Sequence, residues 1–417
     1  MSGSVFHKTA VWAAAALLLA SCGPTSYPKD QLAQRLAETC KREYNLDIKA
    51  QVAGTTLGVE AEIPGLIDEL RKHAPATMPE VPPVLIEGRY AQQALDFRLF
   101  TRGAFTRAEK KLPPDEDRKD PAEPLKKLQQ VSTAVMRACL STDAALEFYL
   151  LVARDPGPDH LDVVLSGHIL DTKRVQFYAI SVGELQNRNE ISLRYQPEHL
   201  ARSLLMEFAR DLQQMPLPQL LSRYTAPSKR FGDLLPMVLS VAMEWKAKGS
   251  MDSSQWPVRQ IKKDEVLVLI QPYLFTVQLG EGGATLLSID KLESGALPEN
   301  YRELGPPETW KDAFYLESIT LSEFIAAQIA KRVMGEFKLL GQEPQPAAKK
   351  VPETPATVEE VTKSVMGAAA YITENYDFKN FSEVTVVDAL KGTRWSVPSA
   401  QLPLYRKRDA PDLKPIP

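Results

Sequence analysis

The stretch IKAQVAGTTLGVEAEI, residues 48–63, decides the fold that the sequence predicts. On each side of its centre, apolar residues alternate with polar or small ones, which is the pattern of strands with one buried face. Ala53-Gly54-Thr55 separates the two runs, and a glycine at such a break is typical of a hairpin turn. Ahead of the hairpin, apolar residues recur at the three- and four-residue spacing of a helix; they are Leu32, Ala33, Leu36, Ala37, Cys40 and Tyr44. The sequence therefore predicts a helix followed by a β-hairpin.

The same helix–hairpin unit is predicted again further along the chain. A helical stripe over residues 128–139 comes before strands at 145–153 and 161–169, and a third strand is predicted at 175–182. Thr357-x-x-Glu360 is a capping box, which begins a helix that leads into strands at 384–389 and 394–397. The implied class is α+β, with repeated helix–β-hairpin units and helices packed on one face of antiparallel sheets.

Other elements are predicted one by one from periodicity and from helix and turn signals. They are a strand at 94–100, a helix that Pro197 opens, a largely buried helix at 233–248, a strand pair at 266–279 and 284–289 with Pro272 at a bulge or edge, and a helix that begins at the capping box Thr320-x-x-Glu323.

The order of these elements predicts contiguous modules separated by segments rich in charge and proline. An N-terminal α+β module is expected at 29–107, a central α+β domain at 125–340 and a helix–hairpin module at 357–400. Residues 108–124 and 341–356 are interpreted as linkers, and 401–417 as a flexible tail.

The first 21 residues have the organisation of a secretory signal peptide. A short polar segment carrying Lys8 is followed by an unbroken apolar run from Ala10 to Ala20. A bilayer-spanning helix needs about 20 apolar residues, so this run is too short to cross a membrane but has the length of a signal-peptide core.

The end of that run, Leu19-Ala20-Ser21-Cys22, resembles the lipobox of bacterial lipoproteins. The resemblance implies cleavage between Ser21 and Cys22 by the lipoprotein signal peptidase and a diacylglyceryl group on the Cys22 thiol. It also implies a membrane address, and Gly23 after the cysteine favours the outer membrane, with the folded part in the periplasm. Residues 22–28 would form a short tether. Residues 40–63 and 167–188 loosely resemble uncharacterised bacterial lipoproteins, which implies no activity.

The composition is that of a soluble globular protein outside the signal peptide. Apolar residues make up 44% and charged residues 25% of the chain, and the formal net charge is −3. Because there is no basic block, nucleic acid is not expected as a partner. The membrane, through the lipid on Cys22, and an envelope protein are the partners expected.

Cys40 and Cys139 remain once Cys22 is assigned to the lipid. A disulfide between them would close a loop of about 100 residues and could stabilise the fold by about 4.7 kcal/mol in the chain-entropy model. Two buried free thiols are the alternative interpretation, and the sequence leaves both open.

No catalytic residue, metal site or cofactor is predicted. Ser288-x-x-Lys291 has the spacing of a penicillin-binding protein motif, but its serine ends a strand and the companion motifs are missing. His160, Asp162 and His168 fall at even spacing, so they could share one face of a sheet and bind a metal, but a solvent-facing strand surface is the favoured interpretation. The favoured function is a non-enzymatic envelope lipoprotein that acts through protein contacts. A solute-binding lipoprotein and an unrecognised envelope enzyme are the alternatives.

Overall fold

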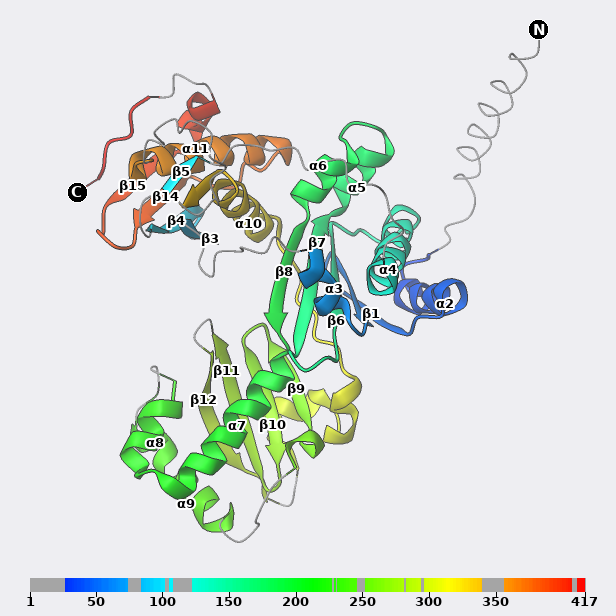
Figure 1. Cartoon of the computed structure of the whole chain (residues 1–417), viewed down its shortest axis with the longest axis vertical. Coiled ribbons are helices and arrows are strands. Elements are labelled where there is room, and N and C mark those ends of the chain that lie inside the picture. Colours follow the sequence, from blue (N-terminus) through cyan, green and yellow to red (C-terminus); the bar gives the residue numbers. More distant parts are fainter. Residues whose placement is uncertain are drawn as a thin grey trace, which may run out of the picture. The chain divides into compact units, whose positions relative to one another are not determined.

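The computed structural model describes residues 27–73, 84–101, 105–107, 122–226, 229, 231–245, 252–280, 283–293, 296–339, 356–406 and 411–416. These residues form an α+β protein with predominantly antiparallel sheets that pack against helices (Figure 1). The chain divides into two compact units. Unit 1 comprises Met1–Glu69, Ala122–Leu185 and Ile191–Ser318, and unit 2 comprises Leu70–Pro121, Gln186–Glu190 and Ile319–Pro417.

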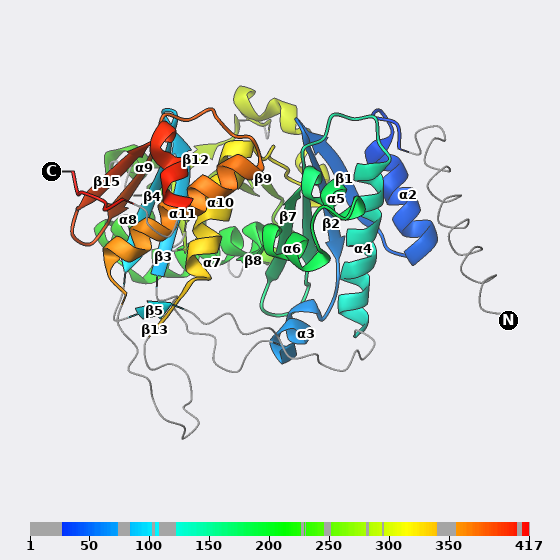
Figure 2. The same ribbon diagram turned by 90° about the horizontal axis from the view of Figure 1, so that it is seen from above.

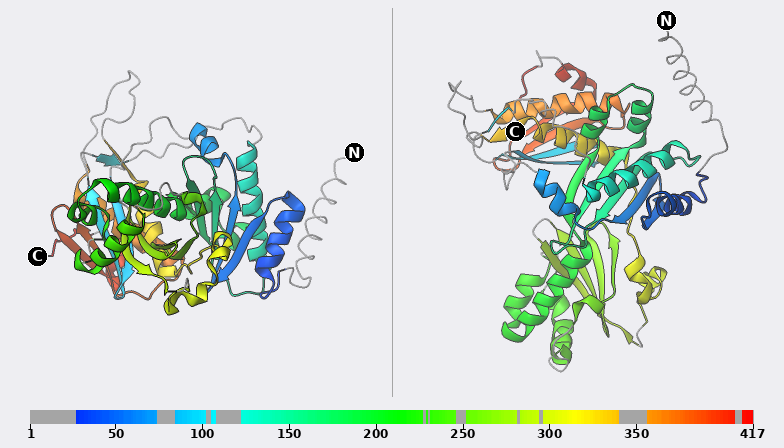
Figure 3. Two further views of the ribbon diagram at one scale, coloured as in Figure 1. Left: turned by 90° about the horizontal axis from the view of Figure 1, so that it is seen from below. Right: turned by 45° about the vertical axis from the view of Figure 1, so that its right-hand side comes forward.

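The first sheet of unit 1 confirms the repeated helix–hairpin unit. Helix α2 (Leu32–Tyr44) leads into the antiparallel pair β1 (Ile48–Ala53) and β2 (Thr56–Glu62). Helix α4 (Glu123–Leu140) leads in the same way into β6 (Phe148–Arg154) and β7 (Leu161–His168). The two hairpins join through a parallel β2–β6 pair, and β8 (Glu190–Tyr195) completes the order β1-β2-β6-β7-β8. Figure 3 shows α2 and α4 side by side next to this sheet.

The turn between β1 and β2 depends on a glycine. Gly54 has a φ of +56°, a left-handed conformation that glycine adopts without the steric cost of a Cβ atom. A Cβ atom at this position would also lie 2.6 Å from the hydroxyl oxygen of Ser318. Both the backbone and its surroundings therefore favour glycine at the centre of the predicted hairpin.

The strand predicted at 175–182 is wrong. The chain forms helix α5 (Ile169–Gln176) directly after β7 and a second short helix, α6 (Val182–Arg188), before β8. Phe177 and Ala179, within the predicted strand, are exposed. His168 starts α5 instead, because its Nδ1 atom accepts a hydrogen bond of 3.0 Å from the backbone N–H of Leu170.

The second sheet of unit 1 is an antiparallel meander that packs against three helices. Its strands follow the order β12-β11-β10-β9, with β9 at Val258–Lys262, β10 at Glu265–Ile270, β11 at Tyr273–Gly280 and β12 at Gly283–Lys291. Helix α7 (Pro197–Gln214) lies along this sheet and is followed by α8 (Leu217–Tyr224) and α9 (Phe231–Trp245) (Figure 3).

Two predictions about this region need correction. The single strand predicted at 266–279 is the β10–β11 hairpin, because Pro272 lies in the turn between two strands rather than at a bulge. The helix predicted as largely buried presents only one face to the core, since Val238 and Val241 are fully buried whereas the Met243 side chain is 73% exposed.

Unit 2 holds a four-stranded sheet that two helices cover on one face. Its order is β15-β14-β4-β3, with β3 at Val84–Ala91, β4 at Ala94–Thr101, β14 at Glu383–Asp388 and β15 at Arg394–Pro398. Helices α10 (Leu321–Met334) and α11 (Val358–Asn375) pack side by side over it (Figure 2), and each begins at the predicted capping box. A short pair, β5 (Phe105–Arg107) with β13 (Phe337–Leu339), lies beside them.

The compact units do not coincide with the contiguous modules predicted from the sequence. Strand β4, expected in the N-terminal module, pairs in parallel with β14 from the C-terminal helix–hairpin unit, so segments at opposite ends of the chain share one sheet. The tail predicted as flexible contributes buried residues to unit 2, because Leu402 and Leu413 are 2% and 7% exposed in its core. Residues 108–121 and 340–355, most of the two expected linkers, lie outside the described residues.

Candidate functional site

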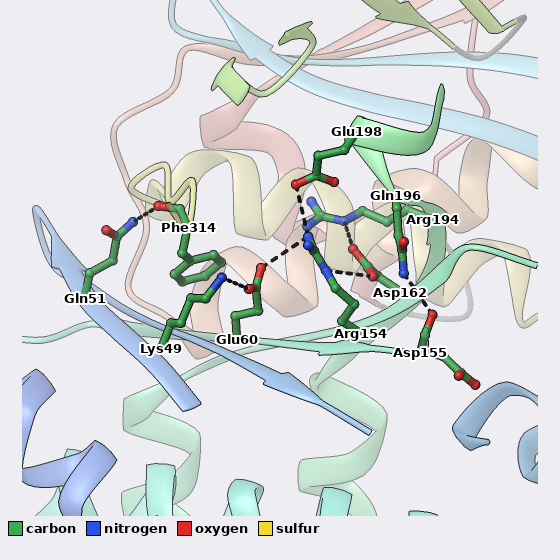
Figure 4. A network of polar contacts seen from close by, with 10 residues as sticks. All are labelled: Lys49, Gln51, Glu60, Arg154, Asp155, Asp162, Arg194, Gln196, Glu198 and Phe314. Carbon is green, nitrogen blue, oxygen red and sulfur yellow. Dashed lines mark hydrogen bonds and ion pairs between the residues drawn. The ribbon is translucent and has the colours of Figure 1, made fainter. Parts of the chain in front are cut away.

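Six charged side chains form a network on the first sheet of unit 1 (Figure 4). Successive strands supply one residue each, and the N-terminal turn of α7 supplies the sixth. They are Lys49 on β1, Glu60 on β2, Arg154 on β6, Asp162 on β7, Arg194 on β8 and Glu198 on α7. Figure 4 shows these side chains on one side of the sheet and helices on the other.

Strand register brings these groups together. Lys49 lies directly opposite Glu60, and Arg154 lies directly opposite Asp162. Side chains opposite each other on neighbouring strands are close enough to interact, so each pair joins two strands across the ladder. Neither pair can be read from local sequence spacing.

Arg154 is the centre of the network. One terminal nitrogen of its guanidinium lies 3.2 Å from Glu60 and 3.4 Å from Glu198, and its Nε atom lies 3.6 Å from Asp162. Lys49 reaches the other oxygen of Glu60 at 3.0 Å. Arg194 approaches the second oxygen of Asp162 at 3.6 Å. The three positive and three negative groups balance in charge.

Burial of the Asp162 carboxylate costs free energy, because the charged group loses its contact with water. The Asp162 side chain has no exposed surface, and neither of its oxygens accepts a hydrogen bond from the part of the chain that the structure describes. Burial raises the pKa of Asp162 to about 6, although Arg154 and Arg194 act in the opposite direction. Burial alone would lower the pKa of Arg154, but Glu198, Glu60 and Asp162 raise it above its usual value.

Backbone contacts hold the start of α7 against this sheet. The Gln196 N–H donates to the carbonyl of His160 at 2.8 Å, and its side-chain amide donates to the carbonyl of Asp155 at 2.9 Å. The Asp155 carboxylate in turn accepts the N–H of Ile67 at 2.8 Å, at the beginning of helix α3 (Leu66–His73). The network and these bonds together fasten α7, which belongs to the second sheet, to the first sheet of the same unit.

The three residues considered for a metal site are not brought together. His160 precedes β7, and its ring stacks on that of His199 at a centroid distance of 3.7 Å. Asp162 belongs to the charge network, and His168 caps α5, about 20 Å along the strand from Asp162 at the usual rise per residue. Burial lowers the pKa of His168 to about 4, so its ring is neutral near pH 7. Within the described residues, no group of three or more His, Cys, Asp or Glu side chains could hold a metal ion.

Cys40 and Cys139 are free, buried thiols, so the structure decides the alternative that the sequence left open and the disulfide is not formed. Burial raises the pKa of Cys40 to about 11, with a smaller contribution from the Glu43 charge. It raises that of Cys139 to about 12, and the nearby Lys173 charge partly opposes this. Both are protonated and unreactive near neutral pH.

Ser288 and Lys291 lie on strand β12 and not on the helix turn that an S-x-x-K motif requires. The Ser288 hydroxyl lies within hydrogen-bonding distance of the Thr276 hydroxyl and of Asp290, at 3.0 and 3.1 Å. The Lys291 ammonium lies over the Tyr273 ring. The lipobox residues Leu19, Ala20, Ser21 and Cys22 lie outside the described residues.

A second polar surface lies on unit 2, on the face of the four-stranded sheet turned away from α10 and α11. Its charged side chains form cross-strand pairs, with Arg89 3.8 Å from Asp96 and Arg394 4.0 Å from Glu383. A hollow of about 380 Å³ lies elsewhere on this unit, and one of about 540 Å³ lies on this face. We call this face, defined by Arg89, Asp96, Arg98, Glu383 and Arg394, the open sheet face.

The fold and the two polar surfaces define an α+β protein with a buried ion network and a mixed-charge sheet face. No protein-family model, curated protein or solved structure matches this chain. Within the described residues, no helix combines the length and the apolar character needed to cross a membrane. Sequence reasoning identified Asp162 but missed its partners, because Glu60, Arg154, Arg194 and Glu198 lie in motifs that resemble ordinary strand and helix surfaces.

Proposed function

We propose that this chain is a lipoprotein. A diacylglyceryl group on Cys22 holds it on the outer membrane, with its folded part in the periplasm. The observation that carries the proposal is the short distance in sequence between the lipobox cysteine and the folded body. Tyr27 is already buried at 6% exposure, bridges to Thr142, and donates its hydroxyl to Thr39 at 3.3 Å. Four residues, 23–26, therefore separate Cys22 from the body, and the five Cα–Cα steps between Cys22 and Tyr27 reach at most about 18 Å.

We further propose that the chain acts without catalysis, through contact with another envelope protein. The open sheet face supports this role, because its strands present paired charges of both signs over a hollow. In the charge network, the ion pairs join strands to one another and to α7. This arrangement suits a structural role for the network better than a catalytic one.

Lipid labelling tests the anchor. Cells that make the wild-type chain should incorporate labelled palmitate into it, and Cys22→Ala should abolish both the incorporation and cleavage at Ser21–Cys22. Cys40→Ala serves as the matched control, since this thiol is buried and its loss should leave labelling intact. Normal palmitate incorporation by the Cys22→Ala variant would refute the anchor.

Site-directed cross-linking tests the contact role. A photoreactive residue at Arg98, which is exposed on the open sheet face, should form one discrete adduct in intact cells. Charge reversal of the neighbouring Asp96 to Arg should remove that adduct. The same probe at Met243, exposed on α9, is the control position. Equal adducts from both positions, or none from Arg98, would contradict the contact role of this face.

Solute binding is the second candidate, and the hollow of about 540 Å³ on the open sheet face favours it. A ligand that binds only the folded state raises its melting temperature. Screening sugars, peptides and metal ions by thermal shift should therefore reveal a ligand, and Arg98→Ala should reduce its effect. A screen without any shift would remove this candidate.

A further inference from the structure

An uncharged, largely apolar segment projects from unit 1, formed by the loop after α5 and the first two residues of α6. We call residues Phe177–Gly183, with the sequence FYAISVG, the α5–α6 tip. Phe177, Tyr178 and Val182 are 75%, 95% and 61% exposed, whereas Leu185 and Ile169 on either side are buried. The flanking helices are thus anchored in the body while the tip itself is presented to the surroundings. Exposed aromatic side chains gathered in one loop are typical of a contact surface.

The tip lies at the same end of unit 1 as the start of the folded chain. Helix α5 packs against α4, and Lys173 on α5 lies close to Cys139 in the last turn of α4. Thr142, two residues after α4 ends, bridges to Tyr27. Figures 1 and 2 both show α5 beside α4. The start of the folded chain and helix α5, which leads into the tip, therefore both lie beside the C-terminal end of α4.

The composition of the tip and its flanks matches a lipid–water interface. Tyrosine favours this region, where its ring contacts acyl chains and its hydroxyl stays in water, and a phenylalanine ring beside it can enter the apolar side of the interface. Lys173, exposed on α5, precedes the tip by one helical turn, since the Phe177 N–H donates to the Lys173 carbonyl at 3.0 Å. A lysine there can keep its ammonium among anionic headgroups while its stem lies on apolar surface.

We infer that the α5–α6 tip inserts into the headgroup region of the membrane to which the lipid on Cys22 holds the chain. The inference rests on the proposed anchor. Two acyl chains suffice for stable anchoring, so the tip adds little affinity. Its effect is on orientation, because a second contact beside a tether of at most about 18 Å restricts rotation of unit 1 about its anchor.

A fluorescent probe on the tip tests this inference. The full lipidated chain carrying Tyr178→Cys is labelled with a polarity-sensitive dye and reconstituted into phosphatidylethanolamine–phosphatidylglycerol vesicles. Labelling is selective because Cys40 and Cys139 are buried. The dye emission should shift to the blue and rise several-fold, and a lipid-borne quencher should reduce it. Met243→Cys, an exposed apolar position on α9, is the matched control and should stay accessible to aqueous iodide.

The outcomes separate the tip from the anchor. If the Tyr178→Cys chain floats with the vesicles while its dye remains in water, the tip contact is overturned and the anchor stays intact. A chain that does not float contradicts both. If the substituted tip is aqueous in vesicles but protected from a thiol reagent in intact cells, a protein covers the tip and the lipid contact is wrong. Melting temperatures equal to wild type verify that each labelled chain is folded.

Discussion

Arg154 and Asp162 face each other on the neighbouring strands β6 and β7, with 3.6 Å between Nε and Oδ1 and no exposed surface on the aspartate side chain. A buried carboxylate that accepts no hydrogen bond, like that of Asp162 among the described residues, depends on nearby positive charge. The stability of unit 1 should therefore depend on this pair and on pH. Substitutions on an ordinary exposed strand surface have little effect of either kind.

Replacing Arg154 by leucine should destabilise the protein by about 3–5 kcal/mol, because Glu60, Asp162 and Glu198 would lose their shared partner in a buried setting. Urea unfolding followed by tryptophan fluorescence measures this loss. Arg137→Leu is the control, since its ion pair with Glu43 is solvent-exposed and its loss should change the stability far less. Similar losses in both variants would mean that the network does not behave as buried.

Asp162→Asn should change how stability depends on pH. The Asp162 carboxyl ionises near pH 6 in the folded chain and near its ordinary value of 3.8 when unfolded. The folded state binds this proton more tightly, so stability falls as pH rises between these values and stays lower above them. The loss is on the order of 3 kcal/mol.

The measurement is the difference in unfolding free energy between wild type and Asp162→Asn, taken from about pH 4 to about pH 7. Across this range, the free energy of unfolding of wild type should fall by that amount relative to that of Asp162→Asn. Asp30→Asn, at an exposed carboxylate, is the control. A difference that stays constant with pH would show that Asp162 titrates as an ordinary aspartate.

Cys40 and Cys139 should both be recovered as free thiols. Burial raises their pKa values to about 11 and 12, so a water-soluble thiol reagent near neutral pH should modify neither in the native chain and both in urea. Mass spectrometry counts the modified thiols. A peptide that links the two cysteines after digestion without reductant would contradict the structure.

Gly58→Ala should be destabilising, by about 1–3 kcal/mol, because a Cβ atom there would lie 2.6 Å from the methyl groups of Leu316. Leu316→Ala alone should cost about 2–5 kcal/mol as a cavity. The double variant should cost less than the sum, with a coupling energy of about 0.5–3 kcal/mol. Strictly additive losses would argue against this contact.

The control for the glycine substitution is Gly232→Ala. A Cβ atom at this position meets nothing within 4 Å among the described residues, and the residue lies in helix α9, so alanine should be neutral or stabilising by up to about 1 kcal/mol.

Much of the local structure could be predicted from the sequence. The hairpin at 48–63, the unit at α4–β6–β7 and the capping boxes at Thr320 and Thr357 all depend on residues within a few positions of one another. The strand predicted at 175–182 was wrong, because the chain there ends helix α5 at Gln176 and begins helix α6 at Val182. The candidate network escaped prediction, since its six residues come from strands and a helix that span residues 49–198.

By itself the sequence determined the helix–hairpin units and led to the expectation of a lipid anchor at Cys22, because periodicity, capping and a short signal motif are properties of neighbouring residues. Only the tertiary structure decided that β2 pairs with β6 and β4 with β14, that Cys40 and Cys139 are separate free thiols, and that Arg154 meets three carboxylates. These outcomes depend on long-range strand pairing and on which surfaces are buried. Both are set by the packing of the whole chain, which neighbouring residues do not specify.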